Sequence, residues 1–183
     1  VGSRYYFNAN NGNSSGSHGD LWVYEMTNDT IWNLTDSRTP SYGPTNPSQF
    51  ISIGSRIYFR GYSESWSDIW AHETTNDTTW NSGLIVIDWY ELDLPFAHIG
   101  SRIFFRIDGN GIVGGGKELG AFEISNETSW EVDDIVAGNA SNIGPSYIRV
   151  IGTQLIFQGL WESGSSLWMH DPIGVTVSGP SSG

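Results

Sequence analysis

The sequence DIWAHETTNDTTW, from Asp68 to Trp80, is one of several copies of the same pattern in this chain. Asp20 to Trp32 reads DLWVYEMTNDTIW, and Glu118 to Trp130 reads ELGAFEISNETSW. Ser166 to Asp171 reads SLWMHD, which begins a fourth copy and then departs from the pattern. Equivalent positions are about fifty residues apart, a period found in propeller and solenoid proteins. The chain is therefore a repeat protein.

A second pattern precedes each copy and predicts a β-hairpin. It reads VGSRYYF from Val1, IGSRIYF from Ile53, IGSRIFF from Ile99 and IGTQLIF from Ile151. The glycine and the residue after it suit a two-residue turn between two apolar strands. Only the second half of this hairpin is present in the first repeat. We therefore expect the first repeat to lack its first strand.

Polar and glycine-rich segments separate these patterns and predict loops. Within the repeats, loops are expected at Asn8 to Gly19, Arg60 to Ser67, Arg106 to Lys117 and Gln158 to Ser165. Between the repeats, longer connectors are expected at Asp36 to Ser48, Asp88 to Pro95 and Asp133 to Pro145. Proline and glycine in the connectors disfavour strand pairing there.

The DIWAHE segment predicts a strand that is covered on both faces, because Ile69 and Trp70 point to opposite sides of it. Thr75 to Thr78 then supplies turn residues that tolerate positive φ, and Trp80 opens a fourth strand. These features predict an all-β, β-propeller-like fold of about four blades of four antiparallel strands, with the first blade incomplete.

The repeats also predict the domain organisation. We expect a single repeat domain from residue 1 to 177, with repeats at about 1–48, 49–96, 97–146 and 147–177. Residues 178–183 are small and polar, and they are expected to form a flexible tail or an expression remnant.

A glycine-containing hairpin, a polar loop and then DLWVYE, TN and Trp occur together at Asp20 to Trp32 and are repeated at Asp68 to Trp80. This combination is similar to kelch-type blades, and it also resembles the ELW-type repeats of secreted archaeal and bacterial surface proteins. The resemblance runs from Val1 to about Asp171. The double glycine of a kelch blade is absent, and Gly120 replaces the third-strand tryptophan. The resemblance implies a propeller fold and an extracellular or cell-surface location.

Composition and charge exclude several classes of partner. Twenty acidic and eight basic side chains give a formal net charge of -12, and Lys117 is the only lysine. Nucleic-acid binding requires clustered Lys and Arg, so no nucleic-acid partner is expected. No apolar run approaches the ~20 residues that span a membrane, so no transmembrane segment is expected. The chain has no cysteine, which excludes disulfides and thiolate metal sites.

Residues at repeated positions favour structural roles over chemistry. Six tryptophans of the third and fourth strands are expected to pack between blades, namely Trp22, Trp70, Trp168, Trp32, Trp80 and Trp130. His72 and His170 share a position with aromatic residues and lack partners at metal-ligand spacing, so no metal and no cofactor are expected. Solvated or salt-bridged structural positions are predicted for the repeated acids Glu25, Glu73, Glu123 and Asp171 and for the repeated bases Arg4, Arg56 and Arg102.

A ligand site is expected where the loops between second and third strands meet the connectors. The candidates are aromatic residues with polar neighbours, namely Tyr42, Trp66, Trp89, Tyr90, Trp161, His18 and Asp108. Exposed rings over sugar faces, with Asn or Asp as acceptors, would form a glycan-binding site. Asp108 also begins a segment with the acid-glycine spacing of calcium loops, but the later glutamate is missing, so a simple turn is predicted.

Six Asn-X-Ser/Thr sequons predict N-glycosylation if the host glycosylates proteins. The acceptor residues are Asn13, Asn28, Asn33, Asn76, Asn126 and Asn139. Asn28, Asn76 and Asn126 occupy the same turn of successive repeats, where asparagine also suits the backbone. Sugars on these three residues would cover one edge of the blades.

The repetition favours a non-catalytic extracellular or cell-surface structural or binding module, because a scaffold repeats its residues whereas catalysis needs unique ones. Glycans or another surface protein are the expected partners. The competing hypothesis is a propeller-type glycoside hydrolase or lyase that uses the carboxylates of Glu91, Asp93 and Asp108.

A third hypothesis is self-assembly. The run from Ile173 to Val177 has strand propensity but lies outside the blade pattern. Paired with the open first blade, it would close the chain on itself or, donated to another copy, form a homo-oligomer or fibre.

Overall fold

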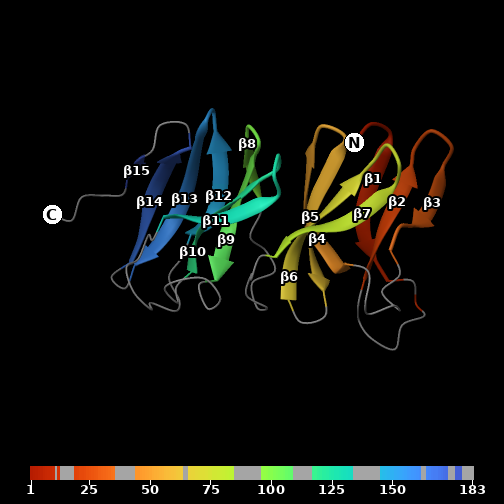
Figure 1. Ribbon diagram of the computed structural model, residues 1–183, viewed down its shortest axis with the longest axis horizontal. Helices are drawn as coiled ribbons and strands as arrows, with labels where there is room; N and C mark the ends of the chain where they lie inside the picture. The colour runs from red at the N-terminus through yellow and green to blue at the C-terminus, as the bar shows by residue number, and fades with distance from the viewer. Residues whose placement is uncertain are drawn as a thin grey trace. The chain divides into compact units, whose positions relative to one another are not determined.

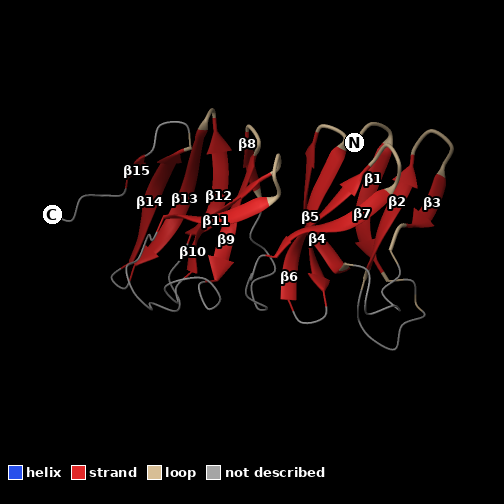
Figure 2. Ribbon diagram, viewed as in Figure 1, coloured by secondary structure: helices blue, strands red, loops and turns tan. Residues whose placement is uncertain are grey.

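The structure is a computed structural model of the 183-residue chain. It describes residues 1–10, 12, 19–35, 44–63, 66–84, 96–108, 117–133, 145–161, 164–172 and 176–178. Residues 66, 83–84, 108, 133, 160–161 and 176–178 are described by their backbone alone. The described elements are all β-strands, and they form four antiparallel sheets (Figures 1 and 2). The chain divides into two compact units, Val1–Ile85 and Val86–Gly183.

The first unit contains a three-stranded and a four-stranded sheet. The order β1-β2-β3 is formed by Arg4–Ala9, Asp20–Glu25 and Thr30–Asn33. The order β4-β5-β6-β7 is formed by Thr45–Ile53, Arg56–Ser63, Trp66–Glu73 and Thr78–Leu84. The first sheet has one strand fewer than the second, which confirms that the first blade is incomplete.

The second unit contains two four-stranded sheets. The order β8-β9-β10-β11 is formed by Ala97–Ile99, Arg102–Asp108, Lys117–Glu123 and Thr128–Asp133. The order β12-β13-β14-β15 is formed by Pro145–Ile151, Gln154–Trp161, Gly164–Asp171 and Thr176–Ser178. In all four sheets, neighbouring strands in the sequence are neighbours in the sheet, as expected for meandering blades.

The predicted hairpins and turns are confirmed. Gly54, Gly100 and Gly152 have φ of 61°, 61° and 64°, so the first central residue of each two-residue turn needs a conformation that glycine adopts freely. The turns between third and fourth strands also contain a positive φ, at Asp29, Asp77 and Glu127. The asparagine before each of these residues accepts a hydrogen bond from a threonine hydroxyl two residues on, at 2.6 to 2.7 Å.

Two predicted loops are wrong, because strands continue through most of them. Arg60 to Ser67 and Gln158 to Ser165 were expected to be loops, but β5 runs to Ser63 and β13 to Trp161. Gly61 and Gly159 allow this extension. A Cβ atom on either would lie within 3 Å of the indole of Trp70 or Trp168, so only glycine leaves room for the neighbouring strand's tryptophan.

The connector predicted at Asp36 to Ser48 is also too long, because β4 begins at Thr45 and contains Pro47. The register of β4 against β5 shifts between Thr45 and Ser48, so the proline occupies a β-bulge and removes no ladder hydrogen bond. In β12 the register shifts in the same way between Ser146 and Arg149.

Each unit has a core between its two sheets. We call the face of a sheet that packs on the following sheet its trailing face, and the opposite face its leading face. In the first unit, Leu21 of the trailing face of β1-β2-β3 packs with Ile57, Phe59 and Trp70 of the leading face of β4-β5-β6-β7. In the second unit, the trailing-face residues Phe104, Leu119 and Ala121 pack with the leading-face residues Leu155 and Phe157.

The C-terminal segment differs from the sequence-based prediction. Thr176 and Val177 pair with Asp171 and His170 of β14, so this part of the Ile173 to Val177 run is the fourth strand of its own sheet. Ser178, expected in the tail, also belongs to β15 and pairs with Met169. Among the described residues, no helix is long and apolar enough to cross a membrane.

Candidate functional site

The same three side chains meet at the hairpin end of three sheets, and we call each group an Arg-Glu-Trp cluster. Arginine Nε lies 3.2 Å from a glutamate oxygen in the pairs Arg4–Glu25 and Arg102–Glu123, and 3.4 Å in Arg56–Glu73. The guanidinium carbons lie 5.3 to 5.5 Å from the ring centroids of Trp32, Trp80 and Trp130. These are ion pairs combined with cation–π contacts. The predicted salt-bridged position is therefore confirmed for these three acids.

Strand register builds the clusters. Arg56 is the first residue of β5 and lies directly opposite Glu73, the last residue of β6. Trp80 lies opposite Ala71, two residues from Glu73 on the same face. Cross-strand pairs on one face of a sheet are close enough to interact, so one register fixes all three side chains. The same pairing occurs for Arg4 and Glu25.

Hydroxyl and amide groups hold each glutamate in its charged form. Hydrogen bonding by the Ser3 hydroxyl and by Thr27 lowers the pKa of Glu25 to about 2, although desolvation opposes the shift. Ser55 lowers the pKa of Glu73 in the same way. Hydroxyl groups of Thr27 and Thr75 donate to these carboxylates at 2.9 Å. The glutamates are therefore ionised at neutral pH.

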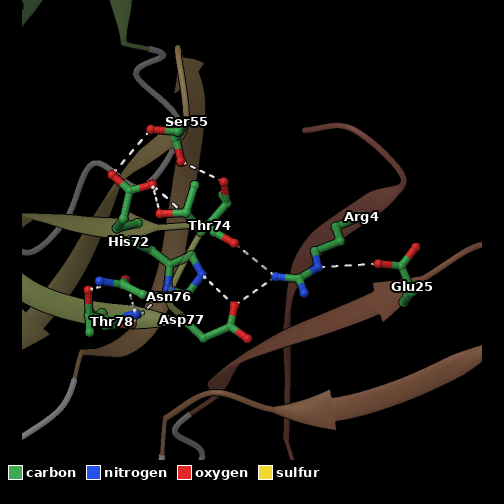
Figure 3. Close-up of polar contacts among 11 residues, drawn as sticks. Arg4, Glu25, Ser55, His72, Thr74, Asn76, Asp77 and Thr78 are labelled. Atoms are coloured by element: carbon green, nitrogen blue, oxygen red, sulfur yellow. Dashed lines mark hydrogen bonds and ion pairs between the residues drawn. The ribbon is translucent and has the colours of Figure 1, made fainter.

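Two of the arginines also reach the following sheet. Arg4 Nη1 donates to the Thr74 carbonyl at 3.2 Å and to Asp77 Oδ1 at 2.7 Å, while its Nε points to Glu25 (Figure 3). In the second unit, Arg102 Nη1 donates to the Pro172 carbonyl at 3.3 Å. Both contacts span 70 residues. The clusters thus connect consecutive sheets within each unit.

A hollow of about 310 Å³ lies beside one of these contacts, and it is shallow and open to solvent. Its lining is Ile99, Gly100, Ser101, Arg102 and Pro172. Because the Arg102 guanidinium is bonded to Glu123 and Pro172, it is already engaged in the structure.

A second set of polar side chains is buried at the opposite, loop end of the first unit. Arg60 is buried, and its Nη2 donates to Ser67 Oγ and to the Tyr62 hydroxyl, both at 2.9 Å. Asp68 is buried as well and accepts from Asn81 Nδ2 at 2.7 Å and from the Ser63 hydroxyl.

The first sheet repeats part of this arrangement, because buried Asp20 accepts from Asn33 Nδ2 at 3.1 Å. In the second unit, Arg106, Lys117 and Glu118 are buried at the equivalent end of β9 and β10. Burying charged groups is costly unless they are paired. The first three sheets thus bury charged side chains at their loop ends.

The structure describes the predicted ligand residues only in part. Trp66 begins β6, Asp108 ends β9 and Trp161 ends β13, so their backbones lie at the loop ends of these strands. Trp66 was expected in a loop, and its strand position is a correction. The other predicted ligand residues, Tyr42, Trp89, Tyr90 and His18, lie outside the described residues, as do Glu91 and Asp93 of the hydrolase hypothesis.

The predicted sequons fall into two groups. Asn28, Asn76 and Asn126 lie on exposed turns. Asn33 is half-buried, and its amide is bonded to Asp20. Asn13 and Asn139 lie outside the described residues.

His72 and His170 pack against aromatic rings. The His72 ring is buried and lies 5.3 Å from the Tyr6 ring, and the His170 ring lies 5.9 Å from the Phe104 ring. His72 Nδ1 is 2.9 Å from Thr79 Oγ1. Within the part of the chain that the structure describes, no group of three or more His, Cys, Asp or Glu could hold a metal ion.

Sequence reasoning missed the contacts between arginine and tryptophan and the contacts to the following sheet. The sequence did contain one signal for the contacts between arginine and tryptophan. Arg4, Arg56 and Arg102 occur in the repeats that have a fourth-strand tryptophan, whereas the fourth repeat has Gln154 at the arginine position and no tryptophan in its fourth strand. The fourth-strand tryptophans were expected to pack between blades, but they lie against the arginine of their own sheet.

Comparison with known proteins gives the fold and no family. No protein family and no curated protein matches the sequence. TolB from Acinetobacter baumannii matches with a TM-score of 0.58 and 10% identity, over 97% of this chain and 40% of that one. The putative TolB from Agrobacterium tumefaciens matches with a TM-score of 0.59 and 11% identity, over 97% of this chain and 61% of that one.

Dipeptidyl peptidase 4 from Porphyromonas gingivalis matches with a TM-score of 0.60 and 9% identity, over 96% of this chain and 30% of that one. This chain therefore spans less than two thirds of each of these proteins. At such identities the likeness establishes the fold alone. The predicted all-β, β-propeller-like class is confirmed, and kelch-type or ELW-type repeats are not identified.

Proposed function

We propose that this chain is a non-catalytic structural and binding module of an extracellular or cell-surface protein. The observation that carries the proposal is the threefold repetition of the Arg-Glu-Trp cluster, in which each glutamate makes the same contacts. A general acid needs a raised pKa, whereas the pKa of Glu25, Glu73 and Glu123 is lowered. These carboxylates therefore suit a scaffold better than proton transfer.

The binding surface that we propose is the loop end. Beneath it, Arg60 is held by Ser67 and Tyr62, and Asp68 is held by Asn81. Hydrogen bonds of this kind hold side chains in place and can fix the geometry of adjoining loops. The ligand class that we propose is a neutral glycan, bound separately by each unit. It would stack on Trp66 in the first unit and on Trp161 in the second unit, where Asp108 would be an acceptor.

Calorimetric titration with neutral chito-, cello- and manno-oligosaccharides tests this proposal. Trp66→Ala should remove binding by the first unit and Trp161→Ala binding by the second, so each should lower the number of bound sugars. Trp130→Ala removes an indole at the opposite, hairpin end and should retain all of the binding. Trp66→Phe keeps a ring in the strand and should retain part of the affinity, which separates loss of stacking from loss of folding. Equal affinity in all variants, or no binding by the parent chain, contradicts the glycan site.

The non-catalytic part of the proposal is tested on the same sugars. No product should form during prolonged incubation with the parent chain. Product formation that is abolished by Asp108→Asn would establish the hydrolase hypothesis instead.

A further inference from the structure

Arg4 of the first unit holds two carboxylates at once. Its Nε lies 3.2 Å from Glu25 Oε2, and its Nη1 lies 2.7 Å from Asp77 Oδ1 of the following sheet (Figure 3). The same Nη1 donates to the Thr74 carbonyl at 3.2 Å. A guanidinium carries five N–H groups in a planar fork, so it can bond several acceptors together. An Arg-Glu-Trp cluster can therefore bind a second carboxylate without losing its own glutamate.

Arg102 of the second unit makes the corresponding bonds except one. Its Nε lies 3.2 Å from Glu123, and its Nη1 donates to the Pro172 carbonyl at 3.3 Å. Pro172 occupies the place of Thr74, because each directly follows the last residue of the third strand of its sheet. In the parts of the second unit that the structure describes, no second carboxylate bonds to Arg102.

The sequence accounts for this difference. Four residues connect the third strand to the fourth in both sheets, namely 74–77 and 172–175. The fourth of them is Asp77 in the first unit and Val175 in the second, where it lies outside the described residues. A valine side chain has no oxygen or nitrogen. The second unit therefore has no acceptor side chain at the position from which Asp77 bonds to Arg4.

The hollow of about 310 Å³ lies beside the Arg102 guanidinium. Its lining consists of Ile99, Gly100, Ser101, Arg102 and Pro172. The Arg102 side chain is 41% exposed, whereas the Arg4 side chain, which bonds to the additional carboxylate, is 27% exposed. The second unit thus has both a cation and open space where the first unit has an ion pair with the following sheet.

We propose that this hollow binds a carboxylate ligand through the Arg102 guanidinium, as Arg4 binds Asp77. Ile99 and Pro172 offer apolar surface to the carbon atoms that bear the carboxylate. Because the Arg102 charge is shared with Glu123 and is partly exposed to solvent, we expect a dissociation constant on the order of 10 mM. A free carboxylic acid and an acidic side chain of a polypeptide share this chemistry. The site lies at the hairpin end, so it does not depend on the glycan ligand proposed for the loop end.

Titration followed by ¹H–¹⁵N NMR at low ionic strength tests the site residue by residue. The probe is N-acetyl-aspartate N-methylamide, and its control is the asparagine analogue, which has the same shape without the charge. The aspartate probe should shift the backbone amides of residues 100–101 and the Arg102 Nε–H. The equivalent amides of residues 2–3 should not shift, because Asp77 already bonds to Arg4. Equal shifts in the two units, or equal shifts with the two probes, would overturn the proposal.

Substitutions at two equivalent positions exchange the properties of the units. Val175→Asp gives the second unit the acid of the first and should weaken binding by about tenfold or more, because an internal carboxylate competes with the probe. Asp77→Gly removes the acid from the first unit and should create a second site, seen as shifts of residues 2–3. Glycine suits this position because Asp77 has a φ of 55°. Binding at residues 100–101 that is unaffected by Val175→Asp would contradict the proposal.

Arg102→Gln tests the guanidinium directly. Gln154 occupies the equivalent position of the fourth repeat, so a sheet of this chain accepts glutamine there. The variant should lose the response to the aspartate probe, and a response that persists would assign the carboxylate to another group and overturn the proposal.

Acetate distinguishes the two sources of the carboxylate in the parent chain. A weaker response to acetate than to the aspartate probe would assign the site to an acidic side chain of a polypeptide. An equal response would assign it to a free carboxylic acid. No response to either compound would overturn the proposal.

Discussion

A Cβ atom on Gly120 of β10 would lie only 2.5 Å from Cγ2 of Ile107 on β9, so no larger residue fits beside this isoleucine. The equivalent positions of the second sheet have the reverse sizes. There Gly61 of β5 faces Trp70 of β6, and a Cβ on Gly61 would lie 2.9 Å from the indole. In the second sheet the small residue is on the second strand and the large one on the third, whereas in the third sheet the large residue is on the second strand and the small one on the third. The space between the two strands is filled in both sheets.

This exchange predicts strong coupling between the two positions. Gly120→Trp alone should overpack the sheet, and Ile107→Gly alone should leave a cavity and cost about 2–5 kcal/mol in the free energy of unfolding. The double variant recreates the arrangement of Gly61 and Trp70, so it should recover about 1–3 kcal/mol relative to the sum of the single changes. Urea denaturation of the four proteins measures the coupling, and additive losses would refute it.

The same relationship limits what the sequence alone could predict. The missing tryptophan at Gly120 predicts a loosely packed third sheet, but Phe105 and Ile107 occupy the space and are both buried. The residues that compensate for the missing tryptophan lie on β9, whereas the repeated sequence pattern describes β10. The pattern of one strand does not show which residue of the neighbouring strand fills the space. Hairpins, turns and strand order follow from local residues such as Gly54 and were predicted correctly.

Contacts between sheets were also not predicted from the sequence. The ion pair of Arg4 with Glu25 connects adjacent strands, whereas the sequence predicted only a solvated or salt-bridged position for the repeated acids. The bond from Arg4 to the Thr74 carbonyl depends on the packing of one sheet on the next, which no local pattern encodes. The same limit applies to Arg60, whose charge suggests solvent exposure but which is buried against Ser67.

Trp70 and Trp130 should differ in their contribution to stability. Trp70 is 7% exposed and belongs to the core of the first unit, so Trp70→Ala should cost about 3–5 kcal/mol in the free energy of unfolding. Trp130 is 37% exposed and contacts Arg102, so Trp130→Ala should cost about 1 kcal/mol. Chemical denaturation measures both, and equal losses would contradict the burial of Trp70.

Acid should destabilise the fold through the three clusters. The pKa of Glu25 is lowered from 4.5 to about 2, and the pKa values of Glu73 and Glu123 are lowered too. Between these values the unfolded chain binds more protons than the folded chain, so stability is full above about pH 5 and falls towards pH 2. Melting temperature against pH measures this fall.

A variant with glutamine at Glu25, Glu73 and Glu123 is the control. It should be less stable at pH 7, and its melting temperature should change less than that of the parent chain between pH 5 and pH 2. An unchanged pH profile would mean that other carboxylates cause the acid sensitivity.

His72 should produce a separate pH dependence at higher pH. Desolvation by burial lowers the pKa of this ring, although nearby Asp77 opposes the shift. The unfolded chain therefore takes up the proton first, and stability should fall as the pH drops below about 6.5. His72→Phe, the residue found at the equivalent Phe122, should remove this slope. It loses the Thr79 hydrogen bond, worth about 1 kcal/mol, and the 3.6 Å contact of Nε2 with Asp77. A slope that persists in His72→Phe would assign it to another group.

Sugar attachment should distinguish the exposed sequons from the packed one. Asn28, Asn76 and Asn126 lie on exposed turns, so a glycan on any of them projects into solvent. Asn33 is different, because its side-chain nitrogen, the atom that a glycan would occupy, donates to buried Asp20. A glycan there would replace one of the two hydrogens on this nitrogen and would place a sugar beside the buried carboxylate of Asp20.

In a glycosylating host, the folded chain should therefore carry sugar at the three turns and not at Asn33. Intact mass measurement counts the glycans, and Thr30→Ala, Thr78→Ala and Thr128→Ala should each remove one. Thr35→Ala should leave the mass unchanged apart from the substitution itself. A folded chain that carries a glycan on Asn33 would contradict the packing of Asn33 against Asp20, since a sugar on this nitrogen needs space beside a buried side chain.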